Sequence, residues 1–340
     1  MSDLTRAADL LPAAVKKKIK TTPLQLRLME ATAINGPPRD ILYLHTVMCQ
    51  TCLPYRDPGD AVRTWERTNG EVHLKINAGE AYHPRLKRFV PVALPFGPKA
   101  RLILMHINQM ALRNDSPVVE VGDSLYKFVR NTLRIDSNGR NMAVVNDQLF
   151  RLSTALIRLA VGDQHNANHA SQVDGKIIEE YDIWAGDDKQ STLWSSEVRL
   201  SHRYWENLKN DLAVPLDDRH IRELTHSAMA LDIYSWLAQR LWRIPVNKPA
   251  QVSWGALYEQ FGQGYNRARL DKFRQVFRVA LKEVLAVYKA ASVEDAARQR
   301  PHRVPAGDGG GGFVIREEPA KGLLLRSSPP PVPRRIFPAS

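Results

Sequence analysis

The hydrophobic positions of the chain follow a helical spacing over long stretches, with short alternating segments between them. Apolar residues recur every three or four positions in three consecutive segments that predict helices, residues 99–113, 125–133 and 146–161. A β-prone run, Val118 to Val121, separates the first two helices, and two β-prone stretches, 176–184 and 193–200, follow the third. Three helices followed by a hairpin are the order expected of a winged helix-turn-helix.

The same order of elements is predicted a second time. The pattern indicates a helix over 226–242, a second helix from its cap at Ser253 to Phe261, and a third over the basic segment 267–289. A wing strand is expected over 313–317. The predicted fold class is therefore α+β, mainly α, with tandem winged helix-turn-helix domains and small β-hairpin wings.

Composition and turn signals divide the chain further. The extension before the first unit favours a short helix over 39–52, and alternation in Val72 to Ile76 after Asn69-Gly70 predicts a hairpin. The expected division is a flexible basic N-terminal arm over 1–38, the first winged-helix unit with its extension over 39–205, the second unit over 206–320, and a disordered Pro/Arg-rich tail over 321–340.

The third helix of the second unit has two faces of opposite character. Its apolar stripe, at spacings of three and four, consists of Phe273, Val276, Phe277, Ala280, Leu281, Val284 and Tyr288. Its cationic residues suit a phosphate-lined partner, because a groove-entering helix places such side chains on bases and backbone. Base edges are expected to be contacted by Arg267, Arg269 and Arg274, and phosphates by Lys272, Arg278 and Lys282. In the first unit the expected DNA contacts are Arg140, Gln148, Arg151 and Arg158.

The charge distribution strengthens this interpretation. The formal net charge is +12, and residues 240–289 hold ten Lys and Arg against three acidic residues, a net +7. The second unit is therefore expected to be the main DNA-binding one, since clustered positive charge attracts polyanions. No run of about 18 apolar residues and no signal peptide is present, so a cytoplasmic protein without a membrane partner is expected.

No motif of an enzyme is evident. The sequence has no phosphate-binding G-x-x-x-x-G-K-[ST] loop, and the histidine pair His165 and His169 lacks the spacing of a rolling-circle nuclease. The C-x-x-C of Cys49 and Cys52 favours two reduced, partly buried thiols over a zinc or redox site, because His45 and His73 are only nominal further ligands. We expect no enzymatic activity, no metal and no cofactor.

Several stretches together resemble the RepA-type plasmid replication initiators of Gram-negative bacteria, over roughly residues 40 to 290. They are Leu53 to Pro58, Trp65 to Arg67 followed by Asn69-Gly70, Leu94 to Leu102, and Val121 to Leu125. The chain departs from the family at Ser137-Asn138-Gly139-Arg140, where a Gly-Gly pair is common.

The resemblance implies a protein that binds repeated sites, or iterons, in its plasmid's origin, opens the adjacent duplex and takes part in copy control. Its implied partners are double-stranded origin DNA, the host initiator and replicative helicase, and a second copy in a homodimer. Two alternatives stay open at this point. One is an autoregulatory repressor without an initiator role, and the other is a DNA nicking or relaxing enzyme.

Overall fold

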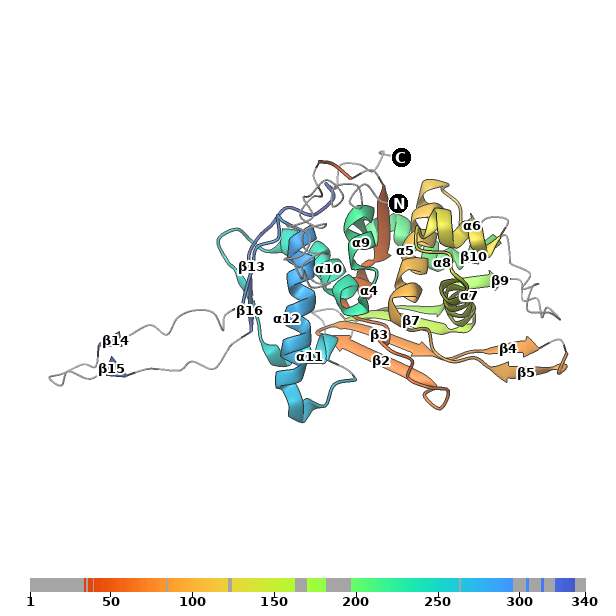
Figure 1. Cartoon of the computed structure of the whole chain (residues 1–340), viewed down its shortest axis with the longest axis horizontal. Coiled ribbons are helices and arrows are strands. Elements are labelled where there is room, and N and C mark those ends of the chain that lie inside the picture. The colour runs from red at the N-terminus through yellow and green to blue at the C-terminus, as the bar shows by residue number, and fades with distance from the viewer. Residues whose placement is uncertain are drawn as a thin grey trace, which may run out of the picture.

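Two groups of helices and short strands, with the same internal order, form most of the molecule (Figure 1). The computed structural model describes residues 34, 36–38, 40–83, 85–121, 124–162, 170–181, 197–262, 264–295, 304–305, 313–314 and 322–333. The predicted basic arm over 1–38 therefore lies almost entirely outside the described residues.

The first group begins with a helix that is buried along most of its length. Its elements are α5 (Gly97–Arg113), β6 (Val118–Glu120), α6 (Leu125–Lys127) continuing as a π-helical turn (Phe128–Thr132), α7 (Gly139–Thr154), β9 (Ile178–Tyr181) and β10 (Glu197–Leu200). Ser124 caps α6 by accepting a hydrogen bond from the Lys127 amide. The three strands form one sheet in the order β6-β10-β9, so the last strand lies between the other two.

The second group repeats this arrangement. Its elements are α10 (Ala228–Arg240), a 3-10 turn (Leu241–Arg243), β12 (Ala250–Val252), α11 (Trp254–Phe261), α12 (Leu270–Val287) after a 3-10 turn (Arg267–Arg269), β13 (Val293–Asp295) and β16 (Leu323–Leu325). Ser253 caps α11, as predicted, through the Ala256 amide. The sheet order is β12-β16-β13, again with the last strand in the middle. The predicted α+β class is confirmed.

The prediction of a disordered tail over 321–340 was wrong for residues 322–333. Leu323 and Leu325 are fully buried, and their strand β16 pairs with both β12 and β13. Tyr288 then donates a hydrogen bond from its hydroxyl to the Pro329 carbonyl at 2.7 Å. The proline-rich composition around it hid this short apolar strand. Of the strand expected over 313–317, only Phe313 and Val314 are described; they form β15 (Phe313–Val314), which pairs with β14 (Val304–Pro305) outside the three-stranded sheet.

The helix predicted over 146–161 in fact starts seven residues earlier and ends at Thr154. Residues beyond it form β7 (Leu156–Gly162), where Ile157 and Leu159 alternate inward as a strand requires. This strand lies in the sheet β2-β3-β7-β8, with β2 (Thr64–Asn69), β3 (Val72–Asn77) and β8 (Ala170–Lys176). The hairpin predicted at Asn69-Gly70 is confirmed, and Gly70 supplies the positive φ of its turn.

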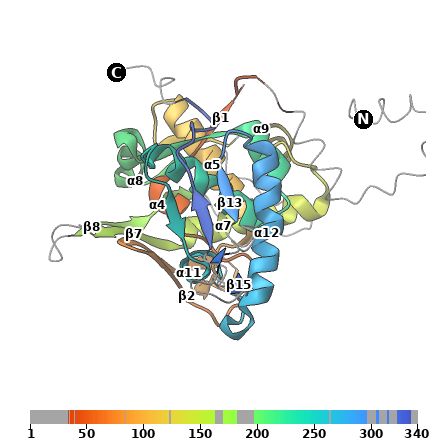
Figure 2. The same ribbon diagram turned by 90° about the vertical axis from the view of Figure 1, so that its left-hand side faces the viewer.

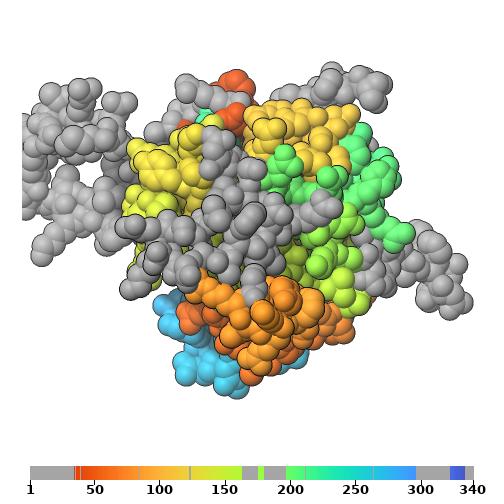
Figure 3. Space-filling view, turned by 90° about the vertical axis from the view of Figure 1, so that its right-hand side faces the viewer, coloured from red at the N-terminus to blue at the C-terminus, as the bar shows by residue number. Residues whose placement is uncertain are grey.

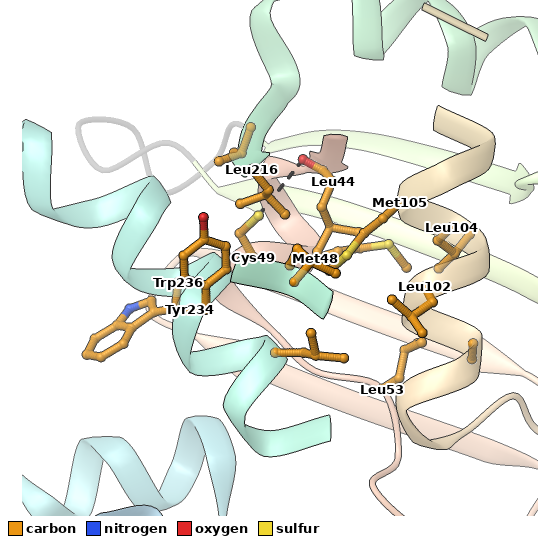
Figure 4. Close-up of a cluster of buried hydrophobic side chains, with 14 of the residues drawn as sticks. Leu44, Met48, Cys49, Leu53, Leu102, Leu104, Met105, Leu216, Tyr234 and Trp236 are labelled. Atoms are coloured by element: carbon orange, nitrogen blue, oxygen red, sulfur yellow. Dashed lines mark hydrogen bonds between the residues drawn. The ribbon is translucent and has the colours of Figure 1, made fainter. Parts of the chain in front are cut away.

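The segment before the first group forms the joint between the two groups. Where a helix over 39–52 was expected, β1 (Ile41–His45) precedes a shorter helix α4 (Thr46–Gln50). β1 pairs antiparallel with β11 (Ala213–Asp217), which lies beyond the boundary expected at residue 205. The remaining elements are α8 (His202–Asn207), a π-helical turn (Leu208–Leu212) and α9 (Asp218–Leu224). One continuous core joins both groups, and Figure 4 shows the part where α4, α5 and α10 meet.

One further element was not predicted from the proline-rich stretch between residues 84 and 98. It is a hairpin of β4 (Glu80–His83) and β5 (Arg88–Pro91), which extends from the body beside α7 (Figure 1). Within the described residues, no helix is long and apolar enough to cross a membrane.

Candidate nucleic-acid interface

Helix α12 is anchored by an aromatic face, as its apolar stripe predicted. Phe273 and Phe277 are fully buried and pack edge-on against Trp254 of α11, with ring centroids 6.5 and 5.7 Å apart. Val284 and Tyr288 continue this buried stripe toward α10 and α9. Figures 1 and 2 show α12 standing along one side of the molecule, outside α10. Its orientation is therefore fixed by packing, which leaves the opposite face outward.

The outward face of α12 carries four side chains at helical spacing. Lys272, Gln275, Val279 and Lys282 are exposed, and Val279 keeps 42% of its surface in contact with solvent. Two of them, Gln275 and Val279, were missed by sequence reasoning that looked for charge. Their place midway between the two lysines on a helical projection could have identified them. A basic stripe with an amide and a methyl-bearing side chain at its centre suits the edges of base pairs.

Arg274 and Arg278 lie on the flank of α12 and not on its outward face. Their guanidinium groups stack over Trp254, 5.6 and 4.9 Å from the ring centroid. Arg278 also pairs with Asp295 of β13, with Nε 2.6 Å from a carboxylate oxygen. Nε of Arg274 is buried without a hydrogen-bond partner among the described residues. Both arginines thus help to join α12 to α11 and β13, and Arg278 in particular has its charge matched within the protein.

Arg267 and Arg269 precede α12 and are highly exposed. Arg267 pairs with Glu259 at 3.0 Å and Arg269 with Asp271 at 3.3 Å, and all four side chains are more than half exposed. Arg269 lowers the pKa of the Asp271 carboxyl through its hydrogen bond. Exposed ion pairs of this kind contribute little to stability, so a phosphate can displace them readily.

A groove of about 400 Å³ runs beside the outward face of α12. It is lined by His226, Ser227, Lys272, Gln275, Val276, Val279, Ala280 and Glu283. At its floor Nε2 of His226 lies 3.2 Å from both oxygens of the largely buried Glu283. The groove therefore adds the polar side chains of His226 and Glu283 to the surface that α12 presents.

In the first unit only one of the expected DNA contacts is well exposed on a helix. Arg140 is exposed on the first turn of α7. Gln148 is fully buried, and its side-chain oxygen accepts a hydrogen bond from the Phe96 amide at 2.7 Å. Its assignment as a DNA contact was wrong, because it serves the backbone at the start of α5. Arg158 lies on β7 and donates to Asn77 on the neighbouring strand at 2.7 Å.

Arg151 is engaged inside the protein, so its assignment to DNA was also wrong. Its side chain is only 13% exposed and pairs with Asp147 at 2.9 Å and Asp57 at 3.4 Å. It donates a further hydrogen bond to the Leu94 carbonyl at 3.2 Å and lies over the Phe96 ring at 5.0 Å. The prediction relied on the charge of Arg151 alone. It could not include the pairing with Asp57, because Asp57 is 94 residues away in sequence.

The two cysteines are buried free thiols. Cys52 donates to the Gln260 carbonyl at 3.2 Å, and burial raises the pKa of both thiols. His45 is also buried and has its pKa lowered to about 4. In the described part of the chain, no group of three or more His, Cys, Asp or Glu side chains could hold a metal ion.

The fold and surface define a class of protein, an α+β chain with a repeated helix–strand order and a basic helix held outward. Residues 94–256 match the family model for the plasmid encoded RepA protein, and the resemblance to RepA-type plasmid replication initiators is confirmed over that region. The match ends in α11, so α12 lies beyond it.

Two solved structures are similar in part, and both are of RctB. A crystal structure of RctB domains 2-3 has a TM-score of 0.44 at 10% identity and covers 83% of this chain and 96% of that chain. A crystal structure of selenomethionine derivatives of domains 2 and 3 has a TM-score of 0.43 at 10% identity and covers 66% of this chain and 80% of that chain. No curated protein sequence matches the chain.

Proposed function

We propose that this chain initiates plasmid replication by binding repeated sites in the duplex DNA of its plasmid's origin, with α12 as the principal reading helix. The observation that carries the proposal is the outward stripe of Lys272, Gln275, Val279 and Lys282 on a helix whose other face is firmly packed. The confirmed RepA family region supports the plasmid context.

Each group of elements is proposed to be a winged helix. In both, a long first helix and a short second helix precede a long third helix, and three strands pair with the last strand in the middle. In such a unit the third helix enters the major groove and the loop between the last two strands forms the wing. For the second unit the wing would lie between β13 and β16, where the described strands β14 and β15 pair with each other.

The exposed side chains of α12 have distinct recognition chemistry. The amide of Gln275 can donate to N7 and accept from the N6 amino group of adenine when suitably oriented, and Val279 can contact a thymine methyl group. Lys272 and Lys282 supply positive charge for phosphates at either end of the stripe. The proposal assigns sequence reading to the centre of the stripe and affinity to its ends.

The initiating action would come from binding energy and would need no catalytic step. Several copies on adjacent repeats can bend or untwist the DNA between them, which lowers the cost of opening a neighbouring A·T-rich stretch. Recruitment of the host initiator and replicative helicase, and a homodimer that controls copy number, belong to the same proposal.

The test is a titration of the full-length chain against labelled origin duplex, with scrambled duplex as competitor, at several salt concentrations. Gln275→Ala should reduce the preference for origin over scrambled DNA by roughly 5–150-fold, the value of one bidentate base contact. Lys282→Ala should weaken both bindings and reduce the slope of log K against log salt by about 0.9. Arg203→Ala is the matched control, since Arg203 is an exposed cation on α8, at the far side of the molecule from α12.

Two outcomes would count against the proposal. Equal competition by origin and scrambled DNA would show that the basic face binds polyanions without reading sequence. An unchanged preference in Gln275→Ala, with a normal salt slope in Lys282→Ala, would move the reading surface away from α12.

A further inference from the structure

The β4–β5 hairpin presents an unusual apolar surface to water. Tyr82 and Phe89 face each other across the two strands, with ring centroids 5.6 Å apart in an edge-to-face arrangement. They are 47% and 66% exposed, and Leu86 in the turn is 53% exposed. Three of the eight large hydrophobic side chains that are exposed in the described structure thus lie within eight residues. A cluster of this kind marks an interaction site more often than scattered exposure does.

The hairpin is held on the body, so the exposure of its rings is not a consequence of fraying. Arg63 donates hydrogen bonds to the carbonyls of Val92, Ala78 and Gly79 at 2.8–3.1 Å, which fastens both ends of the hairpin. Ala81, on the face opposite the rings, is buried. The hairpin therefore packs against the protein at Ala81, near its base, while the aromatic face remains available.

The charge of the hairpin favours a polyanionic partner. Three basic residues, Arg85, Lys87 and Arg88, are exposed in or next to the turn of the hairpin, and the hairpin's single acidic residue is Glu80 at its base. Surfaces that bind single-stranded nucleic acid combine positive charge with aromatic rings on which unpaired bases stack. An apolar protein partner would be matched poorly by the positive charges around these rings.

We propose that the β4–β5 hairpin binds single-stranded nucleic acid, with Tyr82 and Phe89 stacking on bases and Lys87 of the turn contacting the backbone. The hairpin lies at the opposite end of the molecule from α12 (Figure 1) and faces the viewer, in orange, in Figure 3. A chain bound to duplex through α12 would thus hold an opened strand at its other end. This role extends the proposed initiator function, but the interaction itself requires no origin sequence.

The test uses the full-length chain, a labelled 20-nucleotide oligothymidine and, separately, labelled origin duplex. The double variant Tyr82→Ala, Phe89→Ala should lose on the order of 10–100-fold in affinity for oligothymidine, because each ring stabilises the binding of a base that stacks on it. Its affinity for origin duplex should change by less than about twofold, and its thermal unfolding should be unchanged because both rings are exposed. The conservative change Tyr82→Phe, Phe89→Tyr should retain the affinity for oligothymidine, since it keeps both rings.

The control is Tyr126→Ala, which removes a tyrosine of similar exposure on α6. Equal affinity of the double alanine variant and the unmodified chain for oligothymidine would overturn the proposal. So would a fall in self-association, measured by sedimentation, without a change in oligothymidine binding, because the rings would then be a contact between copies. If origin duplex shows no preference but the double variant still loses oligothymidine binding, the initiator proposal fails and this one stands.

Discussion

The buried ion pair between Arg101 and Asp232 provides a sharp test of how the two groups of elements are joined. Arg101 of α5 donates from Nε and Nη2 to the two carboxylate oxygens of Asp232 on α10, at 2.6 and 2.7 Å. Its remaining hydrogen bonds go to the carbonyls of Leu53, Pro54 and Gly97 at 2.8–3.3 Å. Both charged side chains are less than 5% exposed. Every donor of the guanidinium therefore has an acceptor.

The expected cost follows from this geometry. Removing one partner of a buried pair leaves the other charge without compensation and costs about 3–5 kcal/mol. Arg101→Met should lie at the upper end, because it also removes the donor for the Leu53 and Pro54 carbonyls. Burial raises the pKa of Asp232, while Arg101 opposes that rise, so without the arginine this carboxyl should take up a proton more easily. Asp232→Leu should destabilise for the converse reason, since it leaves a buried guanidinium.

The measurement is urea unfolding of both single variants and the double variant Arg101→Met, Asp232→Leu, followed by tryptophan fluorescence and circular dichroism. Because the two residues interact directly, the double variant should cost less than the sum of the singles by on the order of 2 kcal/mol. Glu66→Ala, which breaks the exposed pair with Lys75, should cost no more than about 1 kcal/mol. Additive costs, within about 0.5 kcal/mol, would refute the view that this pair couples α5 to α10.

Two further predictions concern the stability of the chain. Leu323→Ala should destabilise it by about 2–5 kcal/mol, because this side chain fills the core from the central strand of the second sheet. Leu324→Ala, at a half-buried site on the same strand, is the control. Equal urea midpoints for Leu323→Ala and the unmodified chain would show that the strand does not stabilise the fold. Acid should also destabilise the fold, because burial lowers the pKa of three histidines to about 4, and these are His45, His106 and His220. Between pH 6.5 and 4 the unfolded chain binds more protons than the folded one. The free energy of unfolding should therefore fall by about 1.4 kcal/mol for each histidine with each unit by which the pH is lowered. A urea midpoint that stays constant from pH 7 to 5 would contradict this.

Helices α11 and α12 could be predicted closely from sequence because each buries one continuous stripe. Phe273, Phe277 and Val284 recur at a helical period and all are buried, so the pattern and the packing agree. The end of α7 was missed for the converse reason. Leu152 and Leu159 satisfy a helical spacing together, but the chain changes from helix to strand between them at Ala155. The spacing of apolar residues cannot reveal a change from helix to strand when apolar residues at a helical spacing lie on both sides of the change.

The errors in the candidate site have a different cause. Arg151 and Gln148 were assigned to DNA by residue type, yet Asp57 beside Arg151 is 94 residues away in sequence, and Phe96, bonded to Gln148, is 52 residues away. Only tertiary structure brings Asp57 beside Arg151, and no local pattern contains that information. Conversely, Gln275 and Val279 carry no charge, although their positions place them at the centre of the exposed face of α12.

Two of the motifs on which the family resemblance rests, the first and the third, meet at one place in the structure, and it is not the surface of α12. The Leu53 and Pro54 carbonyls of the first motif accept hydrogen bonds from Arg101 of the third, and the Pro54 carbonyl also accepts from the Gly97 amide at 2.9 Å. Tyr55 lies beneath the same guanidinium, at 5.4 Å.

These motifs therefore specify the joint that couples the two units, through a cation that needs a particular set of carbonyls and one carboxylate. A helix that reads a particular DNA sequence has no such internal constraint, because its outward side chains must suit the DNA and not the protein. The family match includes Gly97, Arg101 and Asp232 of this joint and ends before α12. The recognisable part of this sequence is thus the part whose partners lie within the chain, and we propose that the exposed residues of α12 that follow it determine which DNA is bound.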